Sequence, residues 1–182
     1  TTSVCVTGLI VVDTGTYWSV FGQAVILVLI QIGGMGVVTV AAAVTIVSGR
    51  KIGLMQRSTM QEAVAAPKMS GIVRLTGFII RTTILIELSG AALLAPVFCR
   101  DFGPVRGLWM ALFHSISAFC NAGFDILGRQ EPFISLCNYN GNPVVIGTIG
   151  MLIIFGGIGF IVIHDLLQYR RTKKLTLHTR IV

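Results

Sequence analysis

The sequence predicts an all-α membrane protein in which two transmembrane helices flank a re-entrant loop, and in which this unit repeats. The first observation is the composition: 54% of the residues are hydrophobic, 12% are charged and the mean hydropathy is +0.85, far from the averages of soluble domains. The second is that residues 20–47 and 144–164 contain no Asp, Glu, Lys or Arg. Both runs exceed the roughly 20 residues that cross a bilayer core. The third is a pair of glycine-containing turns, each of which precedes such a run.

The basic residues set the predicted orientation in the membrane. The net charge is +7 and the pI is about 9.8, and the cations cluster where apolar runs end. One cluster contains Arg50, Lys51, Arg57 and Lys68, and the other contains Arg170, Arg171, Lys173, Lys174 and Arg180. The positive-inside rule places both clusters in the cytoplasm. No aromatic-interleaved basic motif accompanies them, so the sequence argues against a nucleic-acid partner.

This orientation divides the chain into four segments. Residues 1–48 are the end of a first repeat, 49–70 a cytoplasmic connector, 71–169 a complete second repeat, and 170–182 a basic cytoplasmic segment that leads to a third repeat. Within the second repeat we expect an outward crossing at 71–98, a segment at 107–119 that is too short to span, and an inward crossing at 144–169.

Two landmarks recur along the chain, which indicates an internal repeat. The turns are VTGL at 6–9 and NAGF at 121–124, and the crossings that follow carry QIGGMGVV at 31–38 and IFGGIGFI at 154–161. For the glycine patches we favour close helix packing through small residues. A hinge or a wide spot beside a pathway is the alternative.

Non-helical backbone at membrane depth is tolerated only where protein buries it or water lines it. Its best-known role is an ion filter, in which carbonyl oxygens replace the hydration shell of a cation. Aligned carbonyls require backbone angles that residues with a side chain reach only with strain, so such a loop needs glycine. Gly8 and Gly123 occupy the positions of the two turns where this glycine is needed. The C-terminal end of a short helix at 107–119 would favour cations, and no block of acidic residues lines either loop.

Several polar residues allow two interpretations. Glu87 is either a buried partner of Arg81 or faces the candidate filter from behind. We favour a role in structural support. We expect His114 to hydrogen-bond a neighbour rather than to relay protons. Asn121 and Asp125 support the loop or cap its turn.

Two other classes of protein are weaker alternatives. A secondary transporter of a small solute or of sodium also tolerates glycine patches and repeats. An enzyme would need converging polar groups inside the bilayer, and the chain has three His and four Cys without a CxxC pair. We therefore expect no enzyme, no metal cluster and unpaired cysteines.

The loop sequences resemble a known family. SVCVTGL at 3–9 and FHSISAFCNAGFD at 113–125 are similar to the first and second pore loops of the Ktr/Trk/HKT superfamily of potassium transporters, and LHTRIV at 177–182 resembles the lead-in to its third repeat. The resemblance implies a potassium-channel-like fold with four repeats around one pathway. It assigns the first filter strand to Cys5, Val6, Thr7 and Gly8, and the second to Cys120, Asn121, Ala122 and Gly123. Their backbone carbonyls would bind potassium, although Cys120 departs from the Asn that is more usual in this family.

The resemblance also implies the partners. These are membrane lipid, the third and fourth repeats of the same subunit, a second copy in a homodimer, and a cytoplasmic nucleotide-binding regulatory ring. The location would be the plasma membrane, as a multi-pass protein. We expect potassium to be the transported substrate and no cofactor to be needed. Because the chain lacks an initial Met and a signal peptide, we expect it to be a piece of a longer protein.

Overall fold

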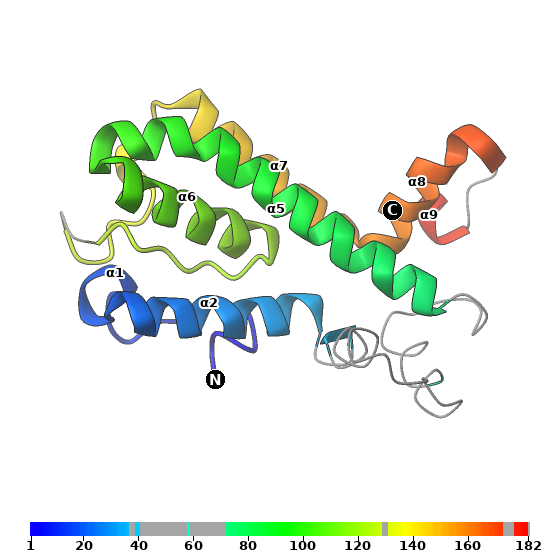
Figure 1. Cartoon of the computed structure of the whole chain (residues 1–182), viewed down its shortest axis with the longest axis horizontal. Helices are drawn as coiled ribbons and strands as arrows, with labels where there is room; N and C mark the ends of the chain where they lie inside the picture. The colour runs from blue at the N-terminus through cyan, green and yellow to red at the C-terminus, as the bar shows by residue number, and fades with distance from the viewer. Residues whose placement is uncertain (37–38, 41–57, 59–71, 129–130, 173–176, 182) are drawn as a thin grey trace.

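The described part of the chain is helical. The computed structural model describes residues 1–36, 39–40, 58, 72–128, 131–172 and 177–181. Its elements are α1 (Thr14–Tyr17), α2 (Val20–Met35), α5 (Ile72–Phe102), α6 (Pro104–Phe119), the short 3-10 helix η1 (Cys137–Tyr139), α7 (Pro143–Ile158), α8 (Phe160–Thr172) and α9 (Leu177–Ile181). The predicted all-α fold is confirmed (Figure 1).

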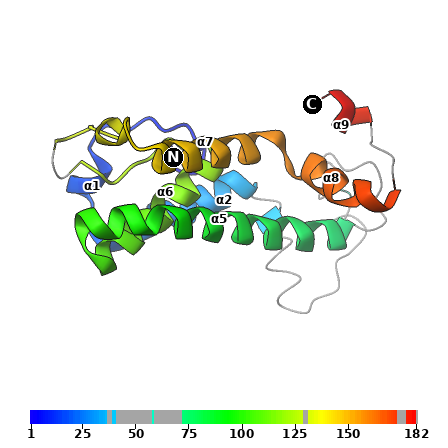
Figure 2. The same cartoon turned by 90° about the horizontal axis from the view of Figure 1, so that it is seen from above.

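Helix α6 occupies the centre of the arrangement. It contacts α5, α7 and α2, and in Figure 1 it lies between α2 on one side and the long α5 on the other. Figure 2 shows α5 and α7 running in roughly the same direction on opposite sides of the view, with α8 continuing beyond α7. The two helices also contact each other. The helix that was predicted to be too short to span is therefore enclosed by α2, α5 and α7.

Residues 72–158 contain a long helix, a shorter helix and a further apolar helix, in that order. The outward crossing expected at 71–98 is α5, and the part of it from Leu75–Phe102 is long and apolar enough to cross a membrane. The short segment expected at 107–119 is α6, which begins earlier because Pro104 fits the first turn of a helix. The chain reverses between α5 and α6 at Gly103, whose φ of 83° suits glycine.

Both predicted inward crossings are interrupted by a glycine with positive φ. Helix α2 ends at Met35 and Gly36 has a φ of 81°, whereas α7 ends at Ile158 and Gly159 has a φ of 88°. Left-handed backbone cannot continue a right-handed helix. The predicted run at 144–169 is thus two helices, α7 and α8. Residues 41–47 and the connector at 49–70, apart from Ser58, lie outside the described residues.

Polar side chains fix where three helices begin. Asp13 accepts a hydrogen bond from the Thr16 backbone N–H at 2.8 Å, and Ser19 accepts one from Gly22 at 3.3 Å. Asn142 accepts from the backbone N–H groups of Val144 and Val145. Each cap satisfies donors that the first turn leaves unpaired.

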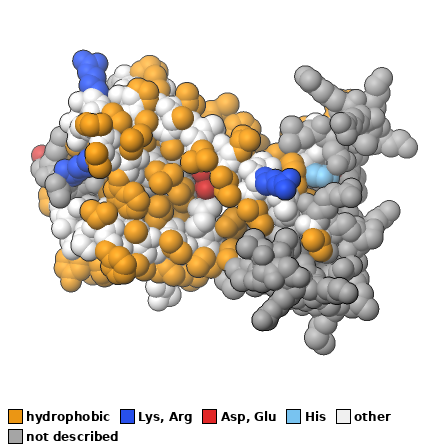
Figure 3. Space-filling model, in the orientation of Figure 1, with side chains coloured by type: hydrophobic (Ala, Val, Ile, Leu, Met, Phe, Trp, Pro, Cys, Tyr) orange, Lys and Arg blue, Asp and Glu red, His pale blue; other side chains and the backbone are white. Residues whose placement is uncertain are grey.

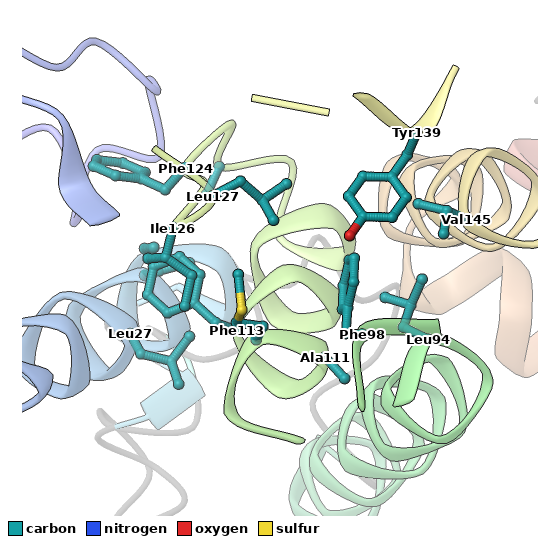
Figure 4. Packing of buried hydrophobic residues seen from close by; sticks show 13 residues of the cluster. Leu27, Leu94, Phe98, Ala111, Phe113, Phe124, Ile126, Leu127, Tyr139 and Val145 are labelled. Atoms are coloured by element: carbon teal, nitrogen blue, oxygen red, sulfur yellow. The ribbon is translucent and has the colours of Figure 1, made fainter. Parts of the chain in front are cut away.

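The hydrophobic core surrounds α6 and includes residues of α2, α5 and α7. Figure 4 shows the cluster, which combines Leu27 of α2, Leu94 and Phe98 of α5, Met110, Ala111 and Phe113 of α6, Phe124, Ile126 and Leu127 of the following loop, Tyr139 of η1 and Val145 of α7. The Phe98 ring lies 5.3 Å from the ring of Tyr139. The Tyr139 hydroxyl donates to Asp101 Oδ2 at 2.8 Å. Burial and this bond raise the pKa of the Tyr139 phenol, which therefore stays neutral at physiological pH.

The outside of the helices is apolar. Leu85, Leu88 and Leu93 of α5 are exposed, as are Met151 and Ile154 of α7. Hydrophobic side chains cover most of the coloured face in Figure 3. An apolar exterior of this extent is typical of helices that face lipid or further helices.

Candidate functional site

The two predicted loops have the same backbone pattern. In the first loop Val6 has a φ of 52° and Gly8 a φ of 69°. In the second, which follows the end of α6 at Phe119, Asn121 has a φ of 56° and Gly123 a φ of 70°. When Gly8 is aligned with Gly123, Val6 falls on Asn121. Two segments that lie far apart in the sequence thus place left-handed backbone at the same alternate positions.

The two loops also meet in space, at their glycines. A Cβ atom added to Gly8 would lie 2.7 Å from the carbonyl oxygen of Ala122 and 3.3 Å from the Cα of Gly123. One added to Gly123 would lie 3.5 Å from the Cα of Gly8. The structure therefore brings the two predicted glycines face to face, with no space for a side chain on Gly8.

The glycine patches pack against the backs of these loops. A Cβ atom at Gly33 would collide with the carbonyl oxygen of Val4, and one at Gly156 would collide with that of Phe119. Val4 precedes the first predicted strand by one residue and Phe119 precedes the second by one, so the two contacts are equivalent. Close packing through small residues is confirmed at these two positions.

The remaining members of each patch differ. Gly34 faces the Cys120 side chain, whereas nothing lies within 4 Å of a Cβ atom at Gly157. Gly36 and Gly159 have open space and positive φ. They end α2 and α7 rather than pack them. Each patch thus combines a packing glycine and a helix-breaking glycine three residues later.

The accessibility of the eight predicted strand residues alternates. Cys5, Thr7, Asn121 and Gly123 are exposed, Val6 and Gly8 are partly buried, and Ala122 is buried. Cys120 is partly buried, with its thiol turned toward Gly34 and Glu87. Gly123 is thus exposed, whereas Gly8 is partly buried against the second loop.

The comparisons with known proteins extend over nearly the whole chain. The family model described as "TrkH: Cation transport protein" matches residues 1–180. The chain belongs to the TrkH cation transport family. It is similar to the potassium/sodium uptake protein NtpJ of Enterococcus hirae (40% identical over 181 residues) and to the Ktr system potassium uptake protein B of Bacillus subtilis (44% over 177 residues) and of Vibrio alginolyticus (35% over 184 residues).

The matches cover only part of these relatives. They include 100%, 97% and 100% of this chain, but 39% of each relative. The TrkH-family chain thus spans about two fifths of the length of the relatives it matches.

Polar groups that the sequence analysis did not single out support the second loop. Ser117, on the last turn of α6, donates to the Phe124 carbonyl at 2.6 Å and accepts from the Phe124 N–H at 3.0 Å. A hydroxyl that closes a loop on its own helix is a recurrent use of serine. The sequence gives one indication of this contact, because Ser117 and Phe124 lie on either side of the predicted turn.

Asp13 contacts the segment that follows the second loop in this TrkH-family chain. Besides capping α1, its Oδ1 accepts a hydrogen bond from the Phe133 N–H at 3.1 Å. Gly15, two residues later, packs against the carbonyl of Ile126. The cap at Asp13 is local, whereas nothing near Asp13 in the sequence indicates its contact with residue 133.

The other polar residues have mainly structural contacts. Asp125 Oδ2 accepts from the Leu127 N–H at 3.2 Å, which is a turn cap, and His114 Nδ1 lies 2.7 Å from the Met110 carbonyl oxygen, which favours its predicted hydrogen-bonding role. The pairing of Glu87 with Arg81 is not found, because the carboxylate contacts Gln31 and Cys120 instead.

The described residues offer no metal centre. Among them no group of three or more His, Cys, Asp or Glu converges, and all four cysteines are free.

Proposed function

We propose that this chain supplies two strands of a potassium selectivity filter in a transport protein of the plasma membrane. Cys5, Val6, Thr7 and Gly8 form one strand, and Cys120, Asn121, Ala122 and Gly123 form the other. The observation that carries the proposal is the meeting of two equivalent loops, with positive φ at alternate residues, at Gly8 and Gly123. Backbone that alternates in handedness turns successive carbonyls toward one side, as a filter requires.

The position of α6 supports a cation as the ligand. Its last residue, Phe119, leads directly into the second strand. The C-terminal end of a helix carries partial negative charge and stabilises a nearby cation by roughly 0.3–1 kcal/mol. With no carboxylate cluster in the described loops, discrimination rests on the carbonyls.

The names of the relatives support potassium as the main substrate. Two Ktr proteins B are named for potassium uptake, and NtpJ is named for uptake of potassium and sodium. We include sodium as the second substrate to be tested. Transport needs no covalent chemistry and no cofactor.

The proposal includes the rest of the pathway. Residues 1–48 and 71–169 act as a first and a second repeat, joined by the connector at 49–70, with 170–182 leading to further repeats. Two strands coordinate a cation from one side only. Two more strands of the same subunit therefore complete its coordination shell. A homodimer and a cytoplasmic nucleotide-binding ring complete the assembly, and the relatives named as parts of a Ktr system support a system with several components.

The test replaces Gly123 by Ser in the full-length protein, with potassium and sodium uptake measured in cells that lack other uptake systems. A residue with a side chain is strained at a φ of 70°, so we expect a higher KM for potassium and a lower preference over sodium. Gly141→Ser is the matched control, because Gly141 has ordinary φ and nothing within 4 Å of its Cβ position. If Gly123→Ser keeps the affinity and selectivity of the control, the filter assignment fails.

A further inference from the structure

A carboxylate lies buried behind the second loop. Glu87 is in the middle of α5, the long apolar helix, and is 4% exposed. A buried charge inside a membrane is unfavourable unless other groups compensate it, and such residues are usually functional. The contacts of Glu87 therefore decide its role.

Its carboxylate faces the other repeat. Gln31 Nε2, on α2, lies 3.0 Å from Glu87 Oε1 and 3.1 Å from Oε2. The third contact is the Cys120 thiol, whose Sγ lies 4.0 Å from Oε1. Both partners are uncharged, and Arg81, on the same helix, is exposed. The described contacts thus give the carboxylate hydrogen-bond donors but no neutralising cation.

The surrounding contacts hold this group in place. Ser115 of α6 donates to the Glu87 backbone carbonyl at 2.6 Å, and its Oγ lies against Gly90, where a Cβ atom would come within 2.5 Å. On the other side, Gly34 lies against the Cys120 side chain. Glu87 and Gln31 therefore form one rigid contact among α2, α5, α6 and the start of the second loop.

We propose that Glu87 is a positioning residue for cation binding. Its carboxylate, oriented by Gln31 of the first repeat, lies behind Cys120 and adds negative charge beside the second strand of the candidate filter. Charges interact more strongly in a water-poor interior than in water, so a cation in the filter supplies the compensation that the side chains lack. This inference rests on the proposed function, because it acts only if residues 120–123 contact the cation.

The test replaces Glu87 by Gln in the full-length protein and measures initial rates of potassium and sodium uptake, normalised to the amount of protein at the cell surface. We expect the KM for potassium to rise about tenfold, the size of effect typical when a hydrogen-bonded charge is lost. The maximal rate per molecule should change less than the KM. Glu131→Gln is the matched control, because it makes the same chemical change at an exposed position.

A double variant separates charge from packing. Gln31→Glu together with Glu87→Gln returns one carboxylate and one amide to the same contact, so we expect it to recover most of the potassium affinity. If Glu87→Gln alone does not reach the membrane, the double variant still tests the inference. A KM for Glu87→Gln equal to that of the control, or a double variant without recovery, would overturn the inference.

The outcome is distinct from a failure of the proposed function. Gly123→Ser changes KM and selectivity if the filter assignment holds, whatever Glu87 does. Unchanged transport in Glu87→Gln beside altered transport in Gly123→Ser would remove the role of Glu87 alone. Unchanged transport in both would remove the filter as well.

Discussion

At the residue scale, the second loop depends on one hydroxyl. Ser117 is 3% exposed and satisfies both backbone groups of Phe124. Phe124 directly follows Gly123, so Ser117 fixes the direction in which the chain leaves the candidate filter. A buried backbone group that loses its partner costs about 1–3 kcal/mol.

We therefore predict that Ser117→Ala lowers the free energy of unfolding by about 1–3 kcal/mol and raises the KM for potassium. Thermal unfolding of the detergent-solubilised full-length protein and uptake kinetics measure the two effects. Ser89→Ala is the control, because the Ser89 hydroxyl is exposed and bonds the Ile86 carbonyl of its own helix. Equal behaviour of the two variants would show that the Phe124 bonds do not matter.

Residues of this kind mark the limit of the sequence analysis. The sequence singled out Gly8 and Gly123 as the glycines of two equivalent loops, because a glycine-containing turn recurs before each of the two apolar runs. The contact of Gln31 could not be predicted, because its partner is fixed only by the tertiary packing, whereas the partner of Ser117 lies only seven residues away across the turn. The contact of Gln31 with Glu87 joins residues 56 positions apart.

At the element scale, the glycine patches have a double role. Gly33 and Gly156 let α2 and α7 approach the backs of the two loops, whereas Gly36 and Gly159 end these helices. The sequence predicted the patches and their packing role. It did not show which glycine breaks the helix, because glycine occurs both inside helices and at their ends.

Alanine at the two packing positions should have similar effects. We predict that Gly33→Ala and Gly156→Ala each destabilise the protein by about 1–3 kcal/mol, as overpacking does, because the new methyl group meets the carbonyl of Val4 or Phe119. The measurement is the thermal stability and the potassium uptake of each variant.

Gly157→Ala serves as the control for this pair. It lies on the same helix with no atom near its Cβ position, so the better helix propensity of alanine should leave stability unchanged or slightly higher. A destabilisation of Gly157→Ala as large as that of Gly156→Ala would contradict the packing role.

At the scale of the whole molecule, the orientation in the membrane remains a prediction. The positive-inside rule places residues after α8 in the cytoplasm and the loop before α7 outside. Neither the connector at 49–70, apart from Ser58, nor residues 173–176 are among the described residues. The order of α5, α6 and α7 agrees with one outward and one inward crossing around a short central helix.

Labelling with a membrane-impermeant maleimide tests this orientation. Cys137 is exposed and unpaired, so we predict that intact cells label it and that Cys137→Ser removes this label. A cysteine introduced at the exposed Tyr169 of α8 should react only after permeabilisation. If Tyr169→Cys raised the labelling of intact cells above that of the parent protein, whose exposed Cys5 and Cys137 are also free, the proposed topology would be reversed.

Docking of the two repeats can also be tested. Asp13 caps α1 and accepts from Phe133, so Asp13→Ala should lower the free energy of unfolding by about 1–2 kcal/mol. Ser19→Ala removes a longer and exposed cap bond and should cost less. Thermal unfolding of the two variants gives the comparison, and an equal loss would limit Asp13 to its role as a helix cap.

The central claim is that two loops from two repeats bind one potassium ion together. The most direct measurement is anomalous diffraction from crystals of the full-length protein soaked in rubidium, a heavier substitute for potassium. We predict an anomalous peak beside Gly8 and Gly123, surrounded by carbonyl oxygens of residues 5–8 and 120–123. Rubidium peaks elsewhere in the protein, with none between these two strands, would contradict the claim.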